Sequence, residues 1–429
     1  MRLRACLLAI AVVLPTRAFA QTPPPAAPPP APEKPAADAA PAAAPAGAPA
    51  PAAVMAAPPA AAVTPPPAAP APTPKFVFGG LVDTYYMYNF TPPSGANSLS
   101  SVQPAFGVGR AFDTNSNSIT LALAKLTMNA SLDVVSLQLD LGYGSVGSII
   151  NGAAPGSSPV APPVGGAFLV EQAFGEITLP VGLPSFTLDF GKFTTTAGAE
   201  VIEANKNWLY SRSLLFNAIP LLHTGARANL KINDNLTLQA SLVNGWNNDP
   251  DLNAWKTGGV SASITVNPML SIVATTYFGK EGQPQAPGTA AATPGDVRFL
   301  GDLVAALTVN SQFGLNLNVD YIKAFDDVAS DYQIGAALMG RYVISDRLNV
   351  AARGEFLASH VETPPGGIGP QTEKQGEGTI MLGVDVGKNF ELRPELRADF
   401  GSSIAGMDVF AGGTKNSEFT GEIAALTWF

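Results

Sequence analysis

Charged side chains recur at every second position in several segments of this chain. Arg393, Glu395, Arg397 and Asp399 form one such series, with apolar residues between them. Because successive side chains of a β-strand point to opposite faces, this spacing collects acids and bases on one face of a strand. Such a face can line a water-filled space and steer charged solutes, and this is the chemistry that the spacing favours.

Groups for covalent catalysis are scarce. The two histidines, His223 and His360, lie in segments that we expect to be far apart. Ser211 and Ser213 precede His223, but the spacing fixes no acidic partner for a serine and histidine pair. The single cysteine, Cys6, lies in the expected signal peptide, so the mature chain has no thiolate. We therefore predict that the protein is not an enzyme.

Metal ligands are limited to carboxylates. Asp326, Asp327 and Asp331 could bind calcium weakly in a loop, because calcium prefers oxygen ligands. Without cysteine or clustered histidine, no dedicated metal site is predicted.

The first twenty residues have the pattern of a signal peptide. Arg2 and Arg4 precede an apolar run over residues 5–14, and Ala18 and Ala20 are the small residues of a cleavage site. The run is too short to cross a bilayer as a helix, and no later apolar stretch is long enough. Cleavage would remove three of the 24 basic residues and leave 21 against 33 acidic ones. That balance argues against nucleic acid as a partner.

Residues 21–74 are almost entirely proline and alanine and contain 20 of the 40 prolines. A segment with so few bulky apolar residues cannot form a core, so we predict a disordered, extended linker in the periplasm. Two interpretations remain open: a spacer, or an arm that contacts a partner such as peptidoglycan.

From residue 75 onward, segments of about ten to thirteen residues alternate between apolar and polar positions, as expected for strands of a membrane barrel. We predict an all-β fold, a transmembrane antiparallel β-barrel of about 16 strands over residues 75–429. The predicted strands begin near Phe76, Ser118, Asp133, Val170, Ser185, His223, Leu236, Thr257, Leu270, Val297, Gly314, Asp331, Leu348, Glu377, Glu391 and Glu418.

Short and long connections follow each other in turn. Tight turns are predicted at residues 233–235, 267–268, 345–347 and 387–389, where Asn, Asp, Gly and Pro favour reversal of the chain. Short turns are typical of the periplasmic end of outer-membrane barrels, and an even strand number places both termini there.

The last segment, residues 418–429, ends on Phe429. Gly421, Ile423 and Ala425 would share the lipid face with it, whereas Glu422 would point inward. Such an ending predicts a bacterial outer-membrane protein, with lipid and the barrel-assembly machinery as partners and Phe429 as the assembly signal.

The polar face of the other strands is expected to point inward. A barrel of about 16 strands is too wide to be filled by side chains, so we expect charged residues there to line water. For any single charge, an ion pair between neighbouring strands is the alternative. The candidate pore-lining residues are Asp83, Asp140, Glu176, Asp189, Arg227, Arg298, Asp302, Asp320, Arg341, Arg353, Glu355, Asp385, Arg393, Glu395, Arg397 and Asp399.

The connection over residues 195–222 is long and partly apolar. Residues 199–216 have helical spacing, and we predict that this loop folds into the barrel and narrows it; capping the barrel or contacting a neighbouring subunit is the alternative. The candidate constriction residues are Glu200, Glu203, Lys206 and Arg212.

Two parts of the chain resemble a known family. The first strand contains Asp83 and the pair Tyr85 and Tyr86. The second part has these residues: Gly191, Lys192, Phe193, Gly198, Glu200, Asn207, Tyr210, Ser211, Arg212, Ser213, His223, Thr224 and Gly225. They resemble the OmpL-like outer-membrane β-barrel porins over about residues 76–429.

The resemblance implies a porin that lets small hydrophilic solutes or ions diffuse passively, without a cofactor, as a monomer or a homotrimer. Two features depart from the family. Thr427 stands where many barrel endings have tyrosine, and the proline and alanine segment is not part of the family's barrel. The alternative function is an anchoring protein whose linker contacts the cell wall.

Overall fold

The structure is a computed structural model. It describes residues 73–91, 109–152, 166–251, 253–281, 296–325, 331–362, 369–402, 410 and 415–429. The expected signal peptide and almost all of the expected linker lie outside these residues, as do Asp326 and Asp327.

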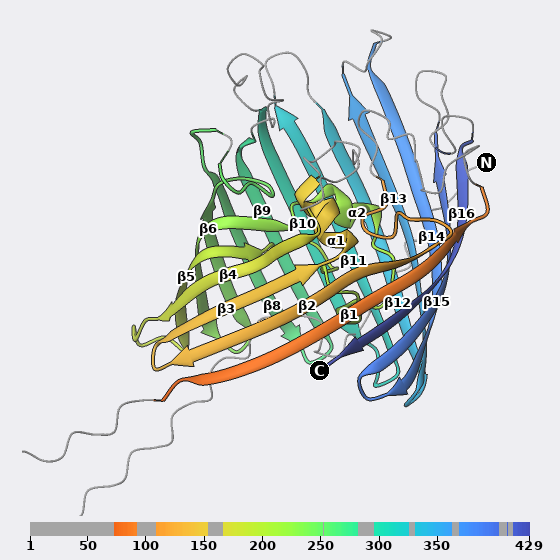
Figure 1. The fold of residues 1–429 in the computed structure, drawn as a ribbon. Helices are drawn as coiled ribbons and strands as arrows, with labels where there is room; N and C mark the ends of the chain where they lie inside the picture. The colour runs from red at the N-terminus through yellow and green to blue at the C-terminus, as the bar shows by residue number, and fades with distance from the viewer. Residues whose placement is uncertain are drawn as a thin grey trace, which may run out of the picture. The chain divides into compact units, whose positions relative to one another are not determined.

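Sixteen antiparallel strands form one closed barrel, in which each strand pairs with its neighbours in sequence and β16 closes on β1 (Figure 1). This confirms the predicted fold class. The strands are β1 (Lys75–Asn89), β2 (Ser118–Leu132), β3 (Val135–Tyr143), β4 (Phe168–Thr178), β5 (Ser185–Thr194), β6 (Leu222–Asn233), β7 (Leu236–Val243), β8 (Thr257–Asn267), β9 (Leu270–Glu281), β10 (Asp296–Thr308), β11 (Phe313–Phe325), β12 (Tyr332–Ser345), β13 (Leu348–Val361), β14 (Gln371–Gly387), β15 (Phe390–Gly401) and β16 (Ser417–Trp428).

In the part of the chain that the structure describes, three short helical elements lie between strands: α1 (Ser145–Gly152), the 3-10 turn η1 (Ala204–Lys206) and α2 (Leu214–Ala218). Within the described ranges, no helix is long and apolar enough to cross a membrane. The helix α1 is not predicted from the sequence, because its eight residues fall in a glycine- and serine-rich connection typical of a loop.

The predicted strand starts agree closely with the structure, except for one. Fifteen of the strands begin within two residues of the predicted position, but β14 begins at Gln371, six residues before Glu377. Its first residues are mostly polar and resemble a loop. Glu373 and Gln375 nevertheless occupy inward positions, where a polar residue continues the alternation of the strand.

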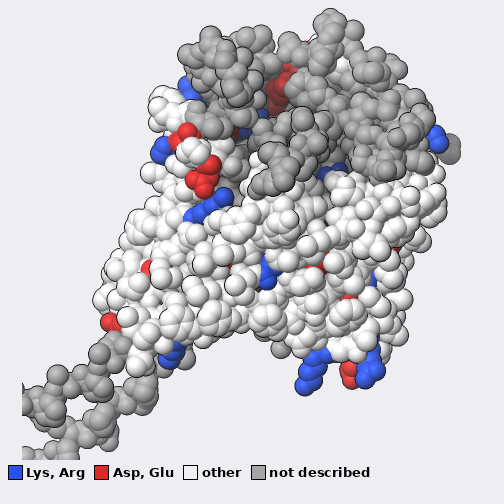
Figure 2. Space-filling model, viewed as in Figure 1, with Lys and Arg blue, Asp and Glu red and all other residues white. Residues whose placement is uncertain are grey.

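The alternation of the two faces is confirmed at the end of the chain. Ile423 is 47% exposed on the outer face, whereas its neighbours Glu422 and Ala424 are buried. Across one side of the barrel, charged side chains are sparse on the middle of the wall and more frequent toward its two ends (Figure 2). The outer face is therefore apolar where it would meet lipid.

The barrel closes at a seam between β1 and β16. The Gly80 N–H donates to the Phe429 carbonyl (3.2 Å), and the Phe429 N–H donates to the Gly80 carbonyl (3.1 Å). A Cβ at Gly80 would lie 2.3 Å from the Phe429 ring, so the ring could keep this position only over a glycine.

Candidate functional site

The segment between β5 and β6, residues 195–221, lies inside the barrel, and we call it the inward loop. The predicted helix over residues 199–216 is wrong, since only η1 and α2 are helical there. The reason is that many backbone N–H and carbonyl groups of this segment form hydrogen bonds with side chains. In a helix these groups would form hydrogen bonds with each other. Gly198 also has φ +87°, a left-handed conformation that no regular helix contains.

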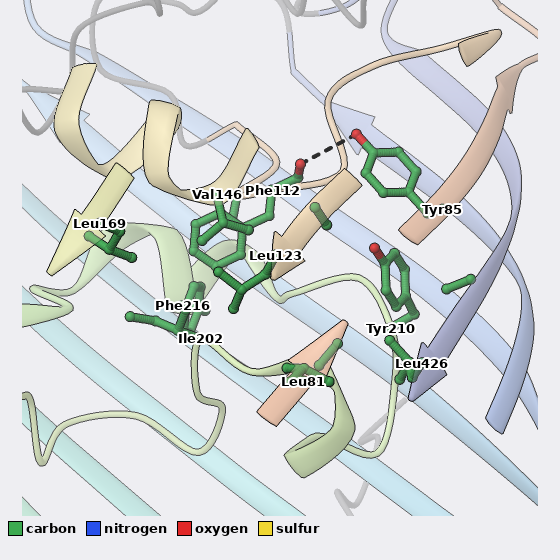
Figure 3. Packing of buried hydrophobic residues seen from close by; sticks show 14 of the residues in the cluster. Leu81, Tyr85, Phe112, Leu123, Val146, Leu169, Ile202, Tyr210, Phe216 and Leu426 are labelled. Atoms are coloured by element: carbon green, nitrogen blue, oxygen red, sulfur yellow. Dashed lines mark hydrogen bonds between the residues drawn. The ribbon is translucent and has the colours of Figure 1, made fainter. Parts of the chain in front are cut away.

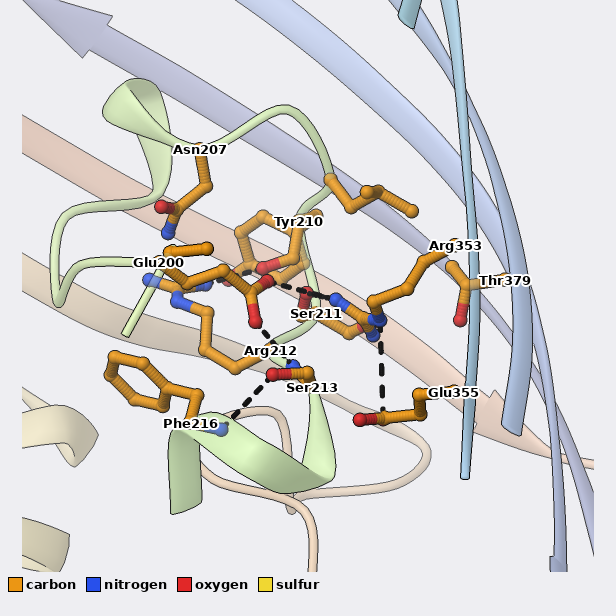
Figure 4. Close-up of polar contacts among 12 residues, drawn as sticks. Glu200, Asn207, Tyr210, Ser211, Arg212, Ser213, Phe216, Arg353, Glu355 and Thr379 are labelled. Atoms are coloured by element: carbon orange, nitrogen blue, oxygen red, sulfur yellow. Dashed lines mark hydrogen bonds and ion pairs between the residues drawn. The ribbon is translucent and has the colours of Figure 1, made fainter. Parts of the chain in front are cut away.

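The loop is first held by its own side chains (Figure 4). Asn207 accepts the Val201 N–H (2.9 Å) and donates to the Val201 carbonyl (2.8 Å). The Arg212 guanidinium also donates to the Val201 carbonyl (3.2 Å) and to that of Ile202. Ser213 caps α2 by accepting the Phe216 N–H (3.0 Å). Asn207, Arg212 and Ser213 belong to the part of the chain that resembles the OmpL-like porins, and their hydrogen bonds fix the conformation of the loop.

Wall carboxylates accept the backbone N–H groups of the loop. Glu395 on β15 accepts from Tyr210 (2.8 Å) and Ser211 (3.1 Å). Glu355 on β13 accepts from Leu214 at 2.6 Å. Buried backbone N–H groups need a hydrogen-bond acceptor, and here the wall supplies it, so the wall fixes the loop backbone.

Wall arginines bind the backbone carbonyls of the same loop. Arg393 donates to Ala204 (2.7 Å) and Asn207 (3.0 Å), and Arg397 donates to Arg212 (2.6 Å). Arg353, whose side chain is fully buried, pairs with Glu200 on the loop (2.9 Å).

Arg353 also contacts Ser211 and Glu377. It donates to the Ser211 carbonyl (2.8 Å) and hydroxyl (3.1 Å) and forms an ion pair with Glu377 on β14. One wall arginine therefore contacts both the loop and a second strand. Figure 4 shows Arg353 beside Glu200 and Ser211 of the loop.

Further bonds tie the loop to other parts of the wall. Lys125 on β2 pairs with Glu203 at 2.6 Å, and Tyr210 donates to Asp83 on β1 at 3.0 Å. Asn318 on β11 accepts the Ala199 N–H at 3.0 Å. The loop thus contacts β1, β2, β11, β13 and β15, which are distributed around the barrel.

Glu203 illustrates the electrostatics of this anchoring. Burial alone would raise its pKa, but the ammonium groups of Lys125 and Lys206 lower the pKa to about 2. The carboxylate therefore stays ionised at neutral pH, and its contribution to stability is lost only as the pH falls from the ordinary range of glutamate toward 2.

An apolar cluster packs beneath the loop (Figure 3). Ile202 and Phe216 from the loop meet Leu81, Leu123 and other buried residues of the wall. Phe112, from the segment that leads to β2, stacks edge-on against Phe216 with ring centroids 5.6 Å apart. A second chain segment, residues 109–116, therefore also folds inward.

Eleven of the predicted pore-lining residues are buried: Asp83, Asp140, Asp189, Asp302, Asp320, Arg353, Glu355, Arg393, Glu395, Arg397 and Asp399. Several of them bind the inward loop, and Asp189 pairs with Arg227 of the neighbouring strand at 2.8 Å. The other five are partly exposed: Glu176, Arg227, Arg298, Arg341 and Asp385.

Among the predicted constriction residues, Glu200, Glu203 and Arg212 are buried and make the contacts described above. Lys206 remains partly exposed and pairs with Glu203. The four residues therefore lie on the inward loop, but three of them are committed to holding it.

Sequence reasoning missed other charged residues of the interior: Arg110, Lys125, Glu171, Glu377 and Glu391. Lys125 lies within 3.0 Å of three carboxylates, those of Asp140, Glu171 and Glu203. These three residues have the spacing of a metal site, and the ammonium of Lys125 is the cation that they surround. The alternation of polar and apolar positions in β2 could have identified Lys125 as an inward residue, because its neighbours Ala124 and Leu126 are apolar.

The histidines do not meet. His223 is buried, stacks on Tyr277 with centroids 4.6 Å apart and contacts the Gly245 carbonyl at 3.0 Å. His360 lies on β13 and contacts Thr372 of β14. Ser211 is bonded to Arg353 rather than to a histidine, so these residues do not form a catalytic pair.

Replacing Gly198 with valine should loosen the inward loop. A Cβ there would lie 2.5 Å from Ile219, and valine disfavours the positive φ. We expect faster amide hydrogen exchange in residues 199–216, with the strands unaffected. Gly182→Val is the control, since its φ is also positive but a Cβ there meets nothing within 4 Å. Equal exchange in the two variants would contradict this role of Gly198.

A closed barrel of 16 strands with a polar interior and an apolar outer face defines the class of outer-membrane β-barrels. Residues 75–429 match the model of the family described as "Putative beta-barrel porin-2, OmpL-like", and the chain belongs to this porin family. No curated protein sequence matches the chain.

Solved structures share the fold at low sequence identity. A loop L8 deletion mutant of OmpT, an outer membrane protein of Vibrio cholerae, has TM-score 0.54 and 12% identity, covering 83% of this chain and 99% of that one. The outer membrane channel DcaP of Acinetobacter baumannii has TM-score 0.53 and 12% identity, covering 83% and 97%. An anion-selective porin from Comamonas acidovorans has TM-score 0.52 and 10% identity, covering 83% and 100%.

Proposed function

We propose that this outer-membrane porin lets small hydrophilic solutes and ions diffuse passively through the barrel, past the inward loop. The observation that carries the proposal is the loop itself. It is tied to both sides of an interior lined with polar groups, so it narrows the barrel at a fixed place. Glu176, Arg227, Arg298, Arg341 and Asp385 remain partly exposed and would line the path of the solutes.

The interior favours polar solutes over apolar ones. Charged side chains lining a narrow space hold water, and an apolar solute would have to displace it. Most solute specificity would then depend on size, because many of the strongest charges are already used to bind the loop.

The proposal also includes the orientation of the barrel. The short turns and both ends of the barrel chain lie at one end, which we assign to the periplasm. Residues 1–20 would be the signal peptide and residues 21–74 a linker in the periplasm. A homotrimer remains part of the proposal, and a structure of OmpT of Vibrio cholerae is described as a trimer form.

A liposome-swelling assay tests the function. Liposomes containing the purified full chain should swell in small sugars and amino acids, at rates that fall steeply with solute size. Swelling at the rate of empty liposomes, by protein that is folded, would favour the anchoring alternative instead.

We expect weak cation selectivity. Among the described residues, 18 acidic side chains are buried against five basic ones, which are Lys125, Arg212, Arg353, Arg393 and Arg397. The excess of acid makes the interior attractive to cations. The preference should fade with salt, because the Debye length falls from about 10 Å at 0.1 M to about 3 Å at 1 M.

Reversal potentials across a salt gradient measure this preference. Firm anion selectivity at low salt would contradict the predicted cation preference. It would mean that the partly exposed Arg227, Arg298 and Arg341 determine which ions pass.

A further inference from the structure

Within the described strands, the outward positions carry charge of one sign only. At outward positions of the described strands we find four lysines near the loop end, Lys192, Lys280, Lys323 and Lys374, and no carboxylate. The acids of the strands are on the inner face, where they are buried or half-buried. In a chain with more acidic than basic residues, this segregation is not what composition alone predicts.

Three of these lysines have no ion pair with a described carboxylate: Lys280, Lys323 and Lys374. Lys192 differs, since it lies 3.6 Å from Asp249. The Lys280 ammonium lies 5.0 Å from the ring centroid of Trp255, which is 61% exposed, and that of Lys323 lies 4.9 Å from the centroid of Phe325. A cation beside an exposed aromatic ring is typical of the boundary between the acyl chains and the headgroups of a membrane.

Polar and aromatic groups fill the interval between Lys323 and Lys374. Lys323 is paired in register with Tyr332, Tyr332 with His360, and His360 with Thr372, across β11 to β14. The rings of Tyr332 and His360 stack at 5.0 Å, and His360 contacts the Thr372 hydroxyl at 2.9 Å. Lys374 follows two residues later on the same face.

Glu362 is the acid of this row, 3.8 Å from His360. It lies beyond the last residue of β13, outside the strand positions that would meet lipid. The outward strand positions from β11 to β14 therefore present two lysines, a hydroxyl and aromatic edges to the membrane.

We propose that Lys280, Lys323 and Lys374 dock the phosphate groups of anionic glycolipids in the outer leaflet. The argument is charge complementarity near the loop end of the strands: these ammonium groups form no ion pair with a described carboxylate, and no described strand carboxylate on that face would repel a phosphate. A compact, strongly hydrated ammonium binds phosphate as a point charge. The inference rests on the proposed orientation, with the loop end outside, and does not depend on which solutes the channel passes.

The test uses the full chain, purified in mild detergent and incubated with diphosphorylated lipid A as the probe. Bound lipid per barrel is counted by mass spectrometry after gel filtration. The triple variant Lys280→Gln, Lys323→Gln, Lys374→Gln should retain about tenfold less lipid than the wild type at low salt, since each surface lysine contributes appreciably to attraction by anionic headgroups. The triple change of the same lysines to arginine should restore retention.

The matched control removes three positive charges at the opposite end, with Lys75→Gln, Arg347→Gln and Lys388→Gln, and should retain lipid as the wild type does. Dephosphorylated lipid A should bind the wild type as weakly as the glutamine variant binds the diphosphorylated form. Equal retention by the glutamine variant and the wild type, or by the two lipids, would overturn the proposal.

Folding and transport are checked separately. Heat-modifiable migration identifies folded barrels; if the triple glutamine variant does not fold, Lys323→Gln and Lys374→Gln singly should each lose part of the retention, and full retention in both would overturn the proposal. Single-channel conductance, measured on the same samples, should be unchanged by the glutamine substitutions. A wild type that binds lipid but conducts nothing would contradict the porin function and leave the lipid site standing.

Discussion

Deleting Phe429 is expected to lower the folded fraction of the barrel more than tenfold. The Gly80 N–H and carbonyl would lose their two hydrogen bonds at the end of the seam, next to the pairing of Leu81 with Trp428. Unpaired backbone groups at the membrane cost several kcal/mol each, and about 1.4 kcal/mol corresponds to a factor of ten. The ring that fills the space over Gly80 would be lost as well.

The heat-modifiable fraction in outer-membrane preparations measures this effect. Lys415→Glu is the control, because it changes a charged residue near the start of β16 and leaves the seam intact. Gly80→Val should have a smaller effect than the deletion, since its Cβ would displace the Phe429 ring but leave the backbone hydrogen bonds in place. Equal folded fractions for the Phe429 deletion and the control would show that the aromatic end is not needed for closure.

Replacing Arg353 with alanine should release the inward loop and destabilise the protein by about 3–5 kcal/mol, the cost of removing one partner of a buried ion pair. Its side chain is fully buried, and Glu200 and Glu377 would both lose their cation. Ser211 would lose two further hydrogen bonds.

Amide hydrogen exchange in residues 199–216 should rise in this variant, and channel recordings should become noisier as the loop moves. Arg347→Ala, in the exposed turn before β13, is the matched control and should change neither property. Unchanged exchange in a folded Arg353→Ala barrel would mean that Glu395, Arg393 and Arg397 hold the loop without it.

The sequence predicts the barrel wall because one physical rule governs it. Strands that separate lipid from a polar interior must alternate with period two, and this made Phe313–Phe325 and Phe390–Gly401 recognisable. Turn residues such as Asn267, which accepts the N–H groups of Met269 and Leu270, marked the tight ends.

The inward loop could not be predicted in the same way. Its apolar residues have helical spacing, but Ile202 and Leu209 are buried in two different clusters. Its backbone conformation depends on Glu395 and Arg393, nearly 200 positions away in the sequence, and local spacing contains no information about such partners.

The surroundings of the inward charged residues could not be predicted from local spacing either. The alternation of side chains along the strand places Arg397 correctly on the inner face. It does not show whether an inward arginine contacts water or a folded loop. Arg397 donates to the Arg212 carbonyl and is 1% exposed. Arg341, on the same face of another strand, remains partly exposed.

The most direct test of the channel is single-channel conductance of the purified full chain in a planar bilayer, compared with a variant in which residues 198–216 are replaced by a short glycine and serine linker. The wild type should show discrete, salt-dependent conductance steps, and the variant should show larger ones, because the inward loop narrows the barrel. Folded wild-type protein that gives no conductance steps, together with a loop-deleted barrel that gives none, would contradict the account.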